Sequence, residues 1–86
     1  MVIEWDEEKN RVLKQERGLS FEAVEEAIES GRILDDVEHT GEQYSHQRIL
    51  IVEIGGYPVM VSYVQDGARI FLKTMFRNRK LKELYQ

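Results

Sequence analysis

The second half of the chain contains three apolar runs separated by two glycine-containing turns, and this pattern limits the fold more than any other feature. The runs are "RILIVEI" (residues 48–54), "YPVMVSYV" (57–64) and "RIFLKTMF" (69–76), and "GG" (55–56) and "QDGA" (65–68) stand between them. Each run is rich in β-branched and aromatic residues, and Gly-Gly and Asp-Gly are typical of tight hairpins. The pattern predicts a three-stranded antiparallel meander.

The first half changes period, which predicts helices. Asp6 is placed as an N-cap and is followed by two glutamates, which suit the positive end of a helix dipole. We expect a helix over about residues 7–16, with Val12 and Leu13 buried and Gly18 as the glycine that ends it.

A second helix is predicted by "SFEAVEEAIESG" (residues 20–31), with Ser20 as N-cap and Gly31 after its end. Its apolar residues recur at helical spacing and line one face, while glutamates take the other face. These apolar residues are Phe21, Val24, Ala27 and Ile28.

Three shorter segments complete the order of elements. "VIEW" (2–5) alternates like a strand, "RILDDVEH" (32–39) is a second candidate strand with Ile33 or Leu34 pointing inward, and "RNRKLKELY" (77–85) predicts a short terminal helix. We interpret Trp5 as a core anchor whose N–H finds a partner.

A chain of 86 residues makes one domain, residues 1–86. The order predicts an α+β fold with two N-terminal helices packed on one face of an antiparallel sheet.

Composition excludes several classes of protein. There is no cysteine, hence no disulfide framework and no thiol nucleophile. No apolar stretch approaches the roughly 20 residues that span a bilayer, and the first residues lack the pattern of a signal peptide. We therefore expect a cytoplasmic protein without membrane contact.

Charge is unevenly distributed along the chain. Residues 1–45 hold 13 acidic and 5 basic side chains, whereas residues 46–86 hold 3 acidic and 7 basic ones. The net charge of −4 argues against a non-specific nucleic-acid binder, but a local basic surface can still attract a polyanion.

The basic residues gather near the C-terminus, where a single acid, Glu83, accompanies six of them. Arginine forms bidentate contacts with phosphate, and lysine supplies point charges. A ribonuclease without metal needs little more than such cations and a group that moves protons at the 2′-hydroxyl. The alternative is a solvated helix face that keeps the protein soluble. The six are Arg69, Lys73, Arg77, Arg79, Lys80 and Lys82.

Two histidines, His39 and His46, invite a metal-site interpretation because acidic residues surround them. Their spacing matches no familiar ligand pattern, so we expect no metal and no cofactor. His46 precedes the strand that begins near Arg48 and is a candidate acid or base near neutral pH. The surrounding acids are Asp35, Asp36, Glu38 and Glu42.

Six segments, in order along nearly the whole chain, resemble the BrnT toxin family, which belongs to the RelE-like group of small ribonuclease toxins. They are "WDEEK" (5–9), "RGLSFEAV" (17–24), "GRILDD" (31–36), "QRILIVEI" (47–54), "GYPVMVSYV" (56–64) and "RKLKELY" (79–85). The resemblance implies a RelE-like fold and the toxin of a toxin–antitoxin pair. Such a toxin cleaves RNA without metal and is neutralised by a cognate antitoxin protein.

The resemblance also implies site residues. Family members carry an arginine after the last strand, which matches Arg79, followed here by Lys80. Arg48 matches an arginine at the start of the central strand, and Tyr85 matches a terminal tyrosine. We expect Arg79, Lys80 and Arg48 to hold the scissile phosphate, Tyr85 to stack or donate a proton, and His46 to serve as a base.

Three further basic residues, Lys73, Arg77 and Lys82, are expected to bind the RNA backbone. A non-catalytic module that docks an antitoxin or another protein is the alternative. It is favoured by the acidic composition and by Glu16-Arg17-Gly18, which stands where family members often read Lys-His-Gly. An exposed strand edge also leaves a homo-oligomer open.

Overall fold

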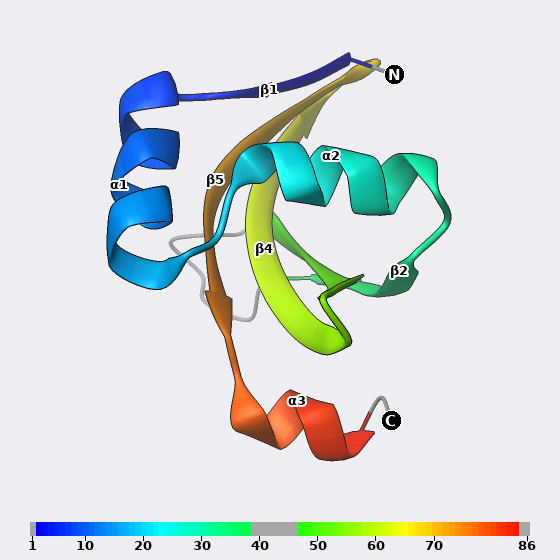
Figure 1. The fold of residues 1–86 in the computed structure, drawn as a ribbon. Helices are drawn as coiled ribbons and strands as arrows, with labels where there is room; N and C mark the ends of the chain where they lie inside the picture. The colour runs from blue at the N-terminus through cyan, green and yellow to red at the C-terminus, as the bar shows by residue number, and fades with distance from the viewer. Residues whose placement is uncertain (1, 39–46, 85–86) are drawn as a thin grey trace.

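The computed structural model describes residues 2–38 and 47–84, apart from the side chain of Arg79, and shows an α+β fold (Figure 1). None of the helices in this part of the chain has the length and apolar character that crossing a membrane requires. The elements follow the expected order: β1 (Val2–Trp5), α1 (Glu7–Arg17), α2 (Phe21–Glu29), β2 (Ile33–Glu38), β3 (Gln47–Ile54), β4 (Tyr57–Asp66), β5 (Arg69–Arg77) and α3 (Arg79–Leu84).

The five strands form one sheet in the order β1-β5-β4-β3-β2. The predicted meander is confirmed, because β3, β4 and β5 pair antiparallel in sequence order. The two-residue turn at Gly55 and Gly56 sets the β3–β4 register, in which Ile54 pairs with Tyr57 and Arg48 pairs with Tyr63.

The expectation of a wholly antiparallel sheet is wrong, because β1 runs parallel to β5. Trp5 of β1 lies opposite Leu72, and α1 continues from there to Arg17, which donates a hydrogen bond to the carbonyl of Met75 (2.8 Å). β1 and α1 thus both run towards the C-terminal end of β5. The sheet is therefore mixed.

Both N-terminal helices begin and end at the expected signals. The carboxylate of Asp6 accepts a hydrogen bond from the Glu8 backbone N–H (2.8 Å), and Gly18 ends α1 with a left-handed φ of 65°. The Ser20 hydroxyl accepts from the Ala23 N–H (3.2 Å) and caps α2. These signals are local, so the sequence alone sufficed to find them.

A buried asparagine on α1 ties the two helices together. Asn10 is 1% exposed, and its side-chain oxygen accepts a hydrogen bond from the Phe21 N–H (2.8 Å) at the start of α2. Its amide donates to Glu22 Oε1 (2.6 Å), and Lys14 Nζ lies 3.2 Å from Glu22 Oε2. The Asn10 hydrogen bond, together with a backbone contact, lowers the pKa of Glu22.

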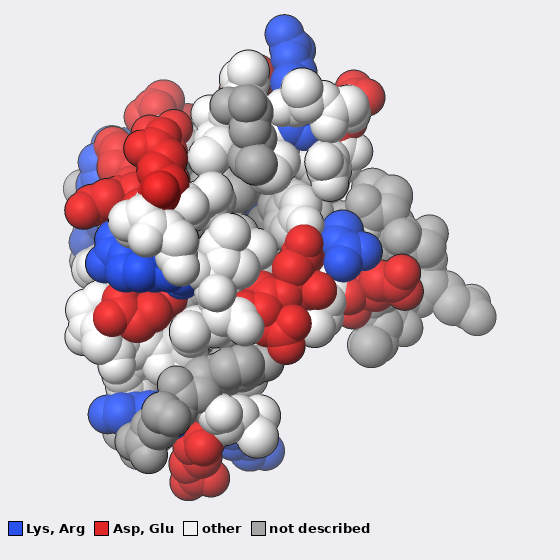
Figure 2. Space-filling view, turned by 90° about the vertical axis from the view of Figure 1, so that its right-hand side faces the viewer, with Lys and Arg blue, Asp and Glu red and all other residues white. Residues whose placement is uncertain are grey.

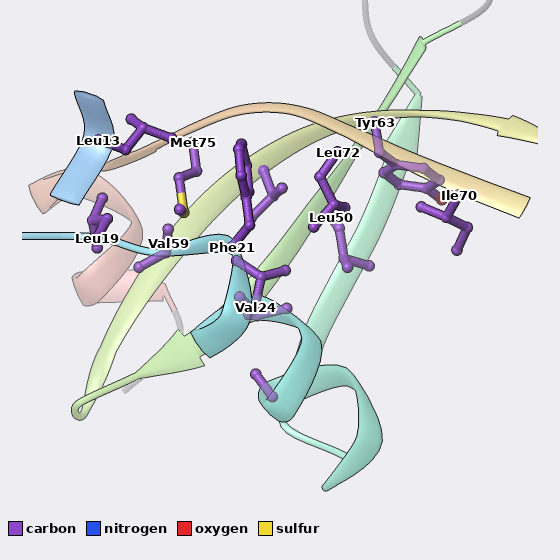
Figure 3. Close-up of a cluster of buried hydrophobic side chains, with 13 residues drawn as sticks. Leu13, Leu19, Phe21, Val24, Leu50, Val59, Tyr63, Ile70, Leu72 and Met75 are labelled. Carbon is purple, nitrogen blue, oxygen red and sulfur yellow. The ribbon is translucent and has the colours of Figure 1, made fainter. Parts of the chain in front are cut away.

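A single apolar core lies between the helices and one face of the sheet (Figure 3). Leu13 of α1 is buried as expected, and Val12 is half-buried. Trp5 packs against this core with its ring centroid 5.9 Å from that of Phe21, but its Nε1 has no hydrogen-bond partner among the described residues. The core residues are Leu13, Leu19, Phe21, Val24, Ala27, Leu50, Val52, Val59, Val61, Tyr63, Ile70, Leu72 and Met75.

Strand β2 forms one edge of the sheet and exposes its apolar residues. Ile33 and Leu34 are 44% and 36% exposed, so the expectation that one of them points into the core is wrong. The register of β2 against β3 shifts between Ile33 and Asp35, which marks a bulge. A bulge places one extra residue in an edge strand and interrupts the inward–outward alternation on which that expectation rested.

Candidate functional site

Arg48 is held in an ion-pair network at the margin of the core. Its Nε lies 3.1 Å from Asp36 Oδ1, and its Nη1 lies 3.9 Å from Glu38 Oε1. The hydrogen bonds to Asp36 and then to Tyr63 raise the pKa of Arg48. Its positive charge is thus already balanced by two acidic side chains of the neighbouring strand.

Tyr63 completes this network and was not among the residues expected from the sequence. Its hydroxyl donates to the Asp36 carboxylate, with both oxygens 2.9 Å away, while its ring lies near Ile70 at the end of the core (Figure 3). Burial, and then the hydrogen bond to Asp36, raises the pKa of the Tyr63 hydroxyl. The signal was present in the sequence, since a two-residue Gly-Gly turn places Tyr63 opposite Arg48.

Three lysines of the C-terminal region, Lys73, Lys80 and Lys82, are exposed and have no carboxylate partner within the described residues. Lys73 Nζ lies 5.2 Å from the centroid of the Phe71 ring, and Lys82 Nζ lies 5.0 Å from that of Tyr57. A cation above an exposed ring is held by only about 0.5–1 kcal/mol, so both lysines remain available to an anion.

The basic residues of the first half behave differently. Arg11 pairs with Glu8, Lys14 with Glu22, and Arg32 with both Glu26 and Glu53. Arg69, at the start of β5, is also paired, with its Nε 3.6 Å from Glu4 Oε1. Among the described residues, the lysines without a carboxylate partner are therefore Lys73 in the middle of β5, Lys80 and Lys82 on α3, and Lys9 on α1.

Arg77 connects β5 with the end of α1. Its Nη1 donates to the carbonyl of Arg17 (2.9 Å), while Arg17 donates in return to the carbonyl of Met75 (2.8 Å). A guanidinium at a helix C-terminus complements the helix dipole. Arg77 thus has a structural role in addition to the expected role in binding RNA.

Helix α3 projects beyond the end of β5, away from α2 (Figure 1). Asn78 caps it by accepting from the Lys80 N–H (3.0 Å), and the Asn78 amide lies 3.9 Å from Met60 Sδ on β4. The Arg79 backbone begins this helix. The Arg79 side chain, Tyr85 and His46 lie outside the described residues, as do His39 and Glu42.

Arg48 and the lysines of α3 do not form one cluster. Arg48 lies opposite Tyr63 on β4, whereas Lys82 lies over Tyr57, six residues away along the same strand. Six residues of strand span roughly 20 Å. Of the expected catalytic set, the structure places Lys80 beside Arg79 in α3 and holds Arg48 apart from them.

On the side of the molecule shown in Figure 2, small groups of basic side chains alternate with small groups of acidic ones. Among the coloured residues of that side, no continuous basic surface is visible. The candidate site therefore rests on the unpaired lysines themselves, with Lys80 and Lys82 on α3 and Lys73 in the middle of β5.

Two exposed aromatic side chains accompany these cations. Phe71 and Phe76 of β5 are 36% and 41% exposed. Both face away from the core, because their neighbours Leu72 and Met75 are buried in it.

Comparisons with protein-family models, with curated protein sequences and with solved structures find no match to this chain.

Proposed function

We propose that this protein is a cytoplasmic toxin of the BrnT type, RelE-like in fold, that cleaves RNA without metal and is neutralised by a cognate antitoxin. One observation supports this function above others. Lys73, Lys80 and Lys82 lack carboxylate partners within the described residues, in a chain with 16 acidic side chains. Cations left unbalanced in the C-terminal part of an acidic chain suit an external polyanion.

The proposed chemistry uses cations and proton transfer. The 2′-oxygen of RNA attacks the adjacent phosphorus, its proton passes to a base, and the 5′-oxygen of the next nucleotide leaves with a proton. Arg79 and Lys80 would stabilise the additional negative charge on the phosphate. Tyr85 is the proposed proton donor or stacking residue, and His46 the proposed base. In this proposal Lys73, Arg77 and Lys82 bind the flanking backbone, and Arg48 contributes at a distance.

Induced expression in a bacterial host tests this proposal. Growth and total RNA integrity are followed together for the wild type, Arg79→Ala and the matched control Arg11→Ala on α1. We expect growth arrest with RNA loss for the wild type and for Arg11→Ala, and neither effect for Arg79→Ala. Cleavage that persists in a folded Arg79→Ala variant would overturn the assignment of Arg79.

A non-catalytic binding module is the second candidate, and the position of Arg48 favours it. Arg48 is balanced by Asp36 and Glu38 and lies apart from α3, which leaves fewer free cations for a scissile phosphate. This candidate predicts normal growth and intact RNA for all three proteins. It also predicts that the lysines of α3 bind a carboxylate-rich protein partner.

A further inference from the structure

The sheet face opposite the two N-terminal helices carries rings and cations side by side. In the β4–β5 register, Phe71 lies opposite Val64 and Phe76 opposite Met60, while the intervening pair is Ser62 with Thr74. The two rings are thus separated by hydroxyl side chains. A protein interface centre is typically a continuous apolar surface, and this arrangement does not provide one.

Lys73 owes its position to an irregularity in β5. The register shifts between Ser62 and Tyr63, which pair with Thr74 and Leu72, so Lys73 is the additional residue of a bulge. Bulges often redirect a side chain, and here Lys73 Nζ lies above the Phe71 ring. A ring with an adjacent ammonium can receive a nucleobase on its face and a phosphate at its edge.

We propose that Phe71 and Phe76 are stacking positions for two bases of single-stranded RNA, with Lys73 binding the phosphate between them. This inference rests on the proposed function, and it adds the type of RNA and the residues that recognise it. Charge supports RNA as the occupant, because Lys73 has no carboxylate partner among the described residues.

The spacing of the rings indicates single strands. Phe71 and Phe76 pair with residues four positions apart on β4, which is roughly 13 Å along the strand. Neighbouring bases of a duplex strand are only about 3.4 Å apart and are covered by their own stack. Two rings at the larger spacing can therefore receive only bases that are splayed out of a stack, as in single-stranded RNA.

Fluorescence anisotropy with a labelled 12-nucleotide single-stranded RNA, and with the same sequence as a duplex, tests the proposal. The titrations use the full chain as wild type and as Arg79→Ala, which prevents cleavage during the measurement. Phe71→Leu and Phe76→Leu remove a ring and keep apolar bulk, whereas Phe71→Tyr keeps the ring. Val37→Ala is the control, because Val37 is 37% exposed on β2, two strands away from β4. Thermal unfolding verifies that each variant is folded.

We expect single-stranded RNA to bind more tightly than the duplex. Each Leu variant should weaken binding roughly 5- to 150-fold, while Phe71→Tyr and Val37→Ala bind like the wild type. RNA binding that weakens in Lys73→Ala and Lys80→Ala but is unchanged in both Leu variants would overturn stacking and leave the proposed function standing.

Absence of RNA binding by the wild type would overturn both proposals. An acidic 12-residue peptide forms the last arm of the experiment. If the peptide binds and the Leu variants weaken it while RNA does not bind, the sheet face recognises protein, and the stacking proposal is wrong.

Discussion

Asn10 shows how one buried polar side chain can determine the contact between two helices. It satisfies the N–H of Phe21 at the start of α2 and also donates to Glu22. Removing the amide leaves a backbone donor buried without a partner, which costs about 1–3 kcal/mol. We expect Asn10→Ala to lower the free energy of unfolding in urea by this amount, and Gln15→Ala, an exposed change on the same helix, to leave it unaltered.

Asn10→Asp separates the two bonds of this side chain. A carboxylate still accepts from the Phe21 N–H but faces the carboxylate of Glu22 and cannot donate to it. We expect this variant to be destabilised at pH 7 and to recover when Glu22 is changed to Gln. Equal stability of Asn10→Ala and the wild type would show that water replaces the asparagine.

Tyr63 gives a pH dependence with a defined sign. The pKa of its hydroxyl is raised above the usual 10.0 in the folded protein, so folding favours the protonated form. The contribution of the hydroxyl to stability is therefore complete below pH 10.0 and is lost as the pH rises through the folded-state pKa. We expect the wild type to be more stable than Tyr63→Phe at pH 8, and this difference to shrink in urea unfolding at pH 11. A difference that grows with pH would contradict the assigned donor.

Residue-level prediction from the sequence succeeded where the cause was local. Asp6, Ser20 and Gly18 act within a few residues of themselves, and each has the predicted role. The partners of Asn10 and Tyr63 are 11 and 27 residues away along the chain. Helical or strand periodicity carries no information on such pairs, so these contacts appear only when the elements are packed.

At the scale of elements, hairpin register was predictable and strand direction at the sheet edge was not. The turn at Gly55 and Gly56 fixes β3 against β4 because two residues leave a single register. The β1 segment has no turn linking it to β5, and 63 residues separate Trp5 from Arg69. Its parallel pairing with β5 joins segments far apart in the sequence, and a local pattern carries no information on such a pair.

The contact between α1 and β5 supplies the prediction that belongs to this scale. Arg77 donates to the carbonyl of Arg17 at the end of α1. We expect Arg77→Ala to lower the free energy of unfolding by about 1 kcal/mol, since one hydrogen bond is lost at an exposed site. Lys80→Ala, which removes the same charge from α3, should leave stability unchanged. An unaltered unfolding midpoint for Arg77→Ala would mean that Arg17 alone holds α1 on the sheet.

This contact also affects how RNA binding by Arg77 variants is interpreted. A change at Arg77 alters both the docking of α1 and the charge of the surface. Lys73 and Lys80 are cleaner probes of charge, because no hydrogen bond to another element is formed by either ammonium in the described part of the chain.

At the scale of the whole molecule, the acidic and basic halves of the sequence differ in how many of their cations are ion-paired. Ion pairs balance Arg11 and Lys14 of α1 and Arg32 after α2, while Lys73 of β5 and the lysines of α3 remain unpaired among the described residues. The excess of basic residues in the second half was predictable, because charges can be counted along the sequence. The ion pair between Arg48 and Asp36 could not be predicted, because the two residues meet only when β2 pairs with β3.

Salt dependence measures how many of these cations contact phosphate. For single-stranded RNA, the logarithm of the binding constant falls with the logarithm of salt concentration with a slope near −0.7 for each contact. Three lysine contacts from Lys73, Lys80 and Lys82 give a slope of roughly −2, and each Lys→Ala change should reduce its magnitude by about 0.7. Lys9→Ala removes the same charge from α1 and should leave the slope unchanged. If Lys9→Ala and Lys80→Ala reduce the slope equally, RNA is attracted by net charge alone, and the surface near α3 is no specific site.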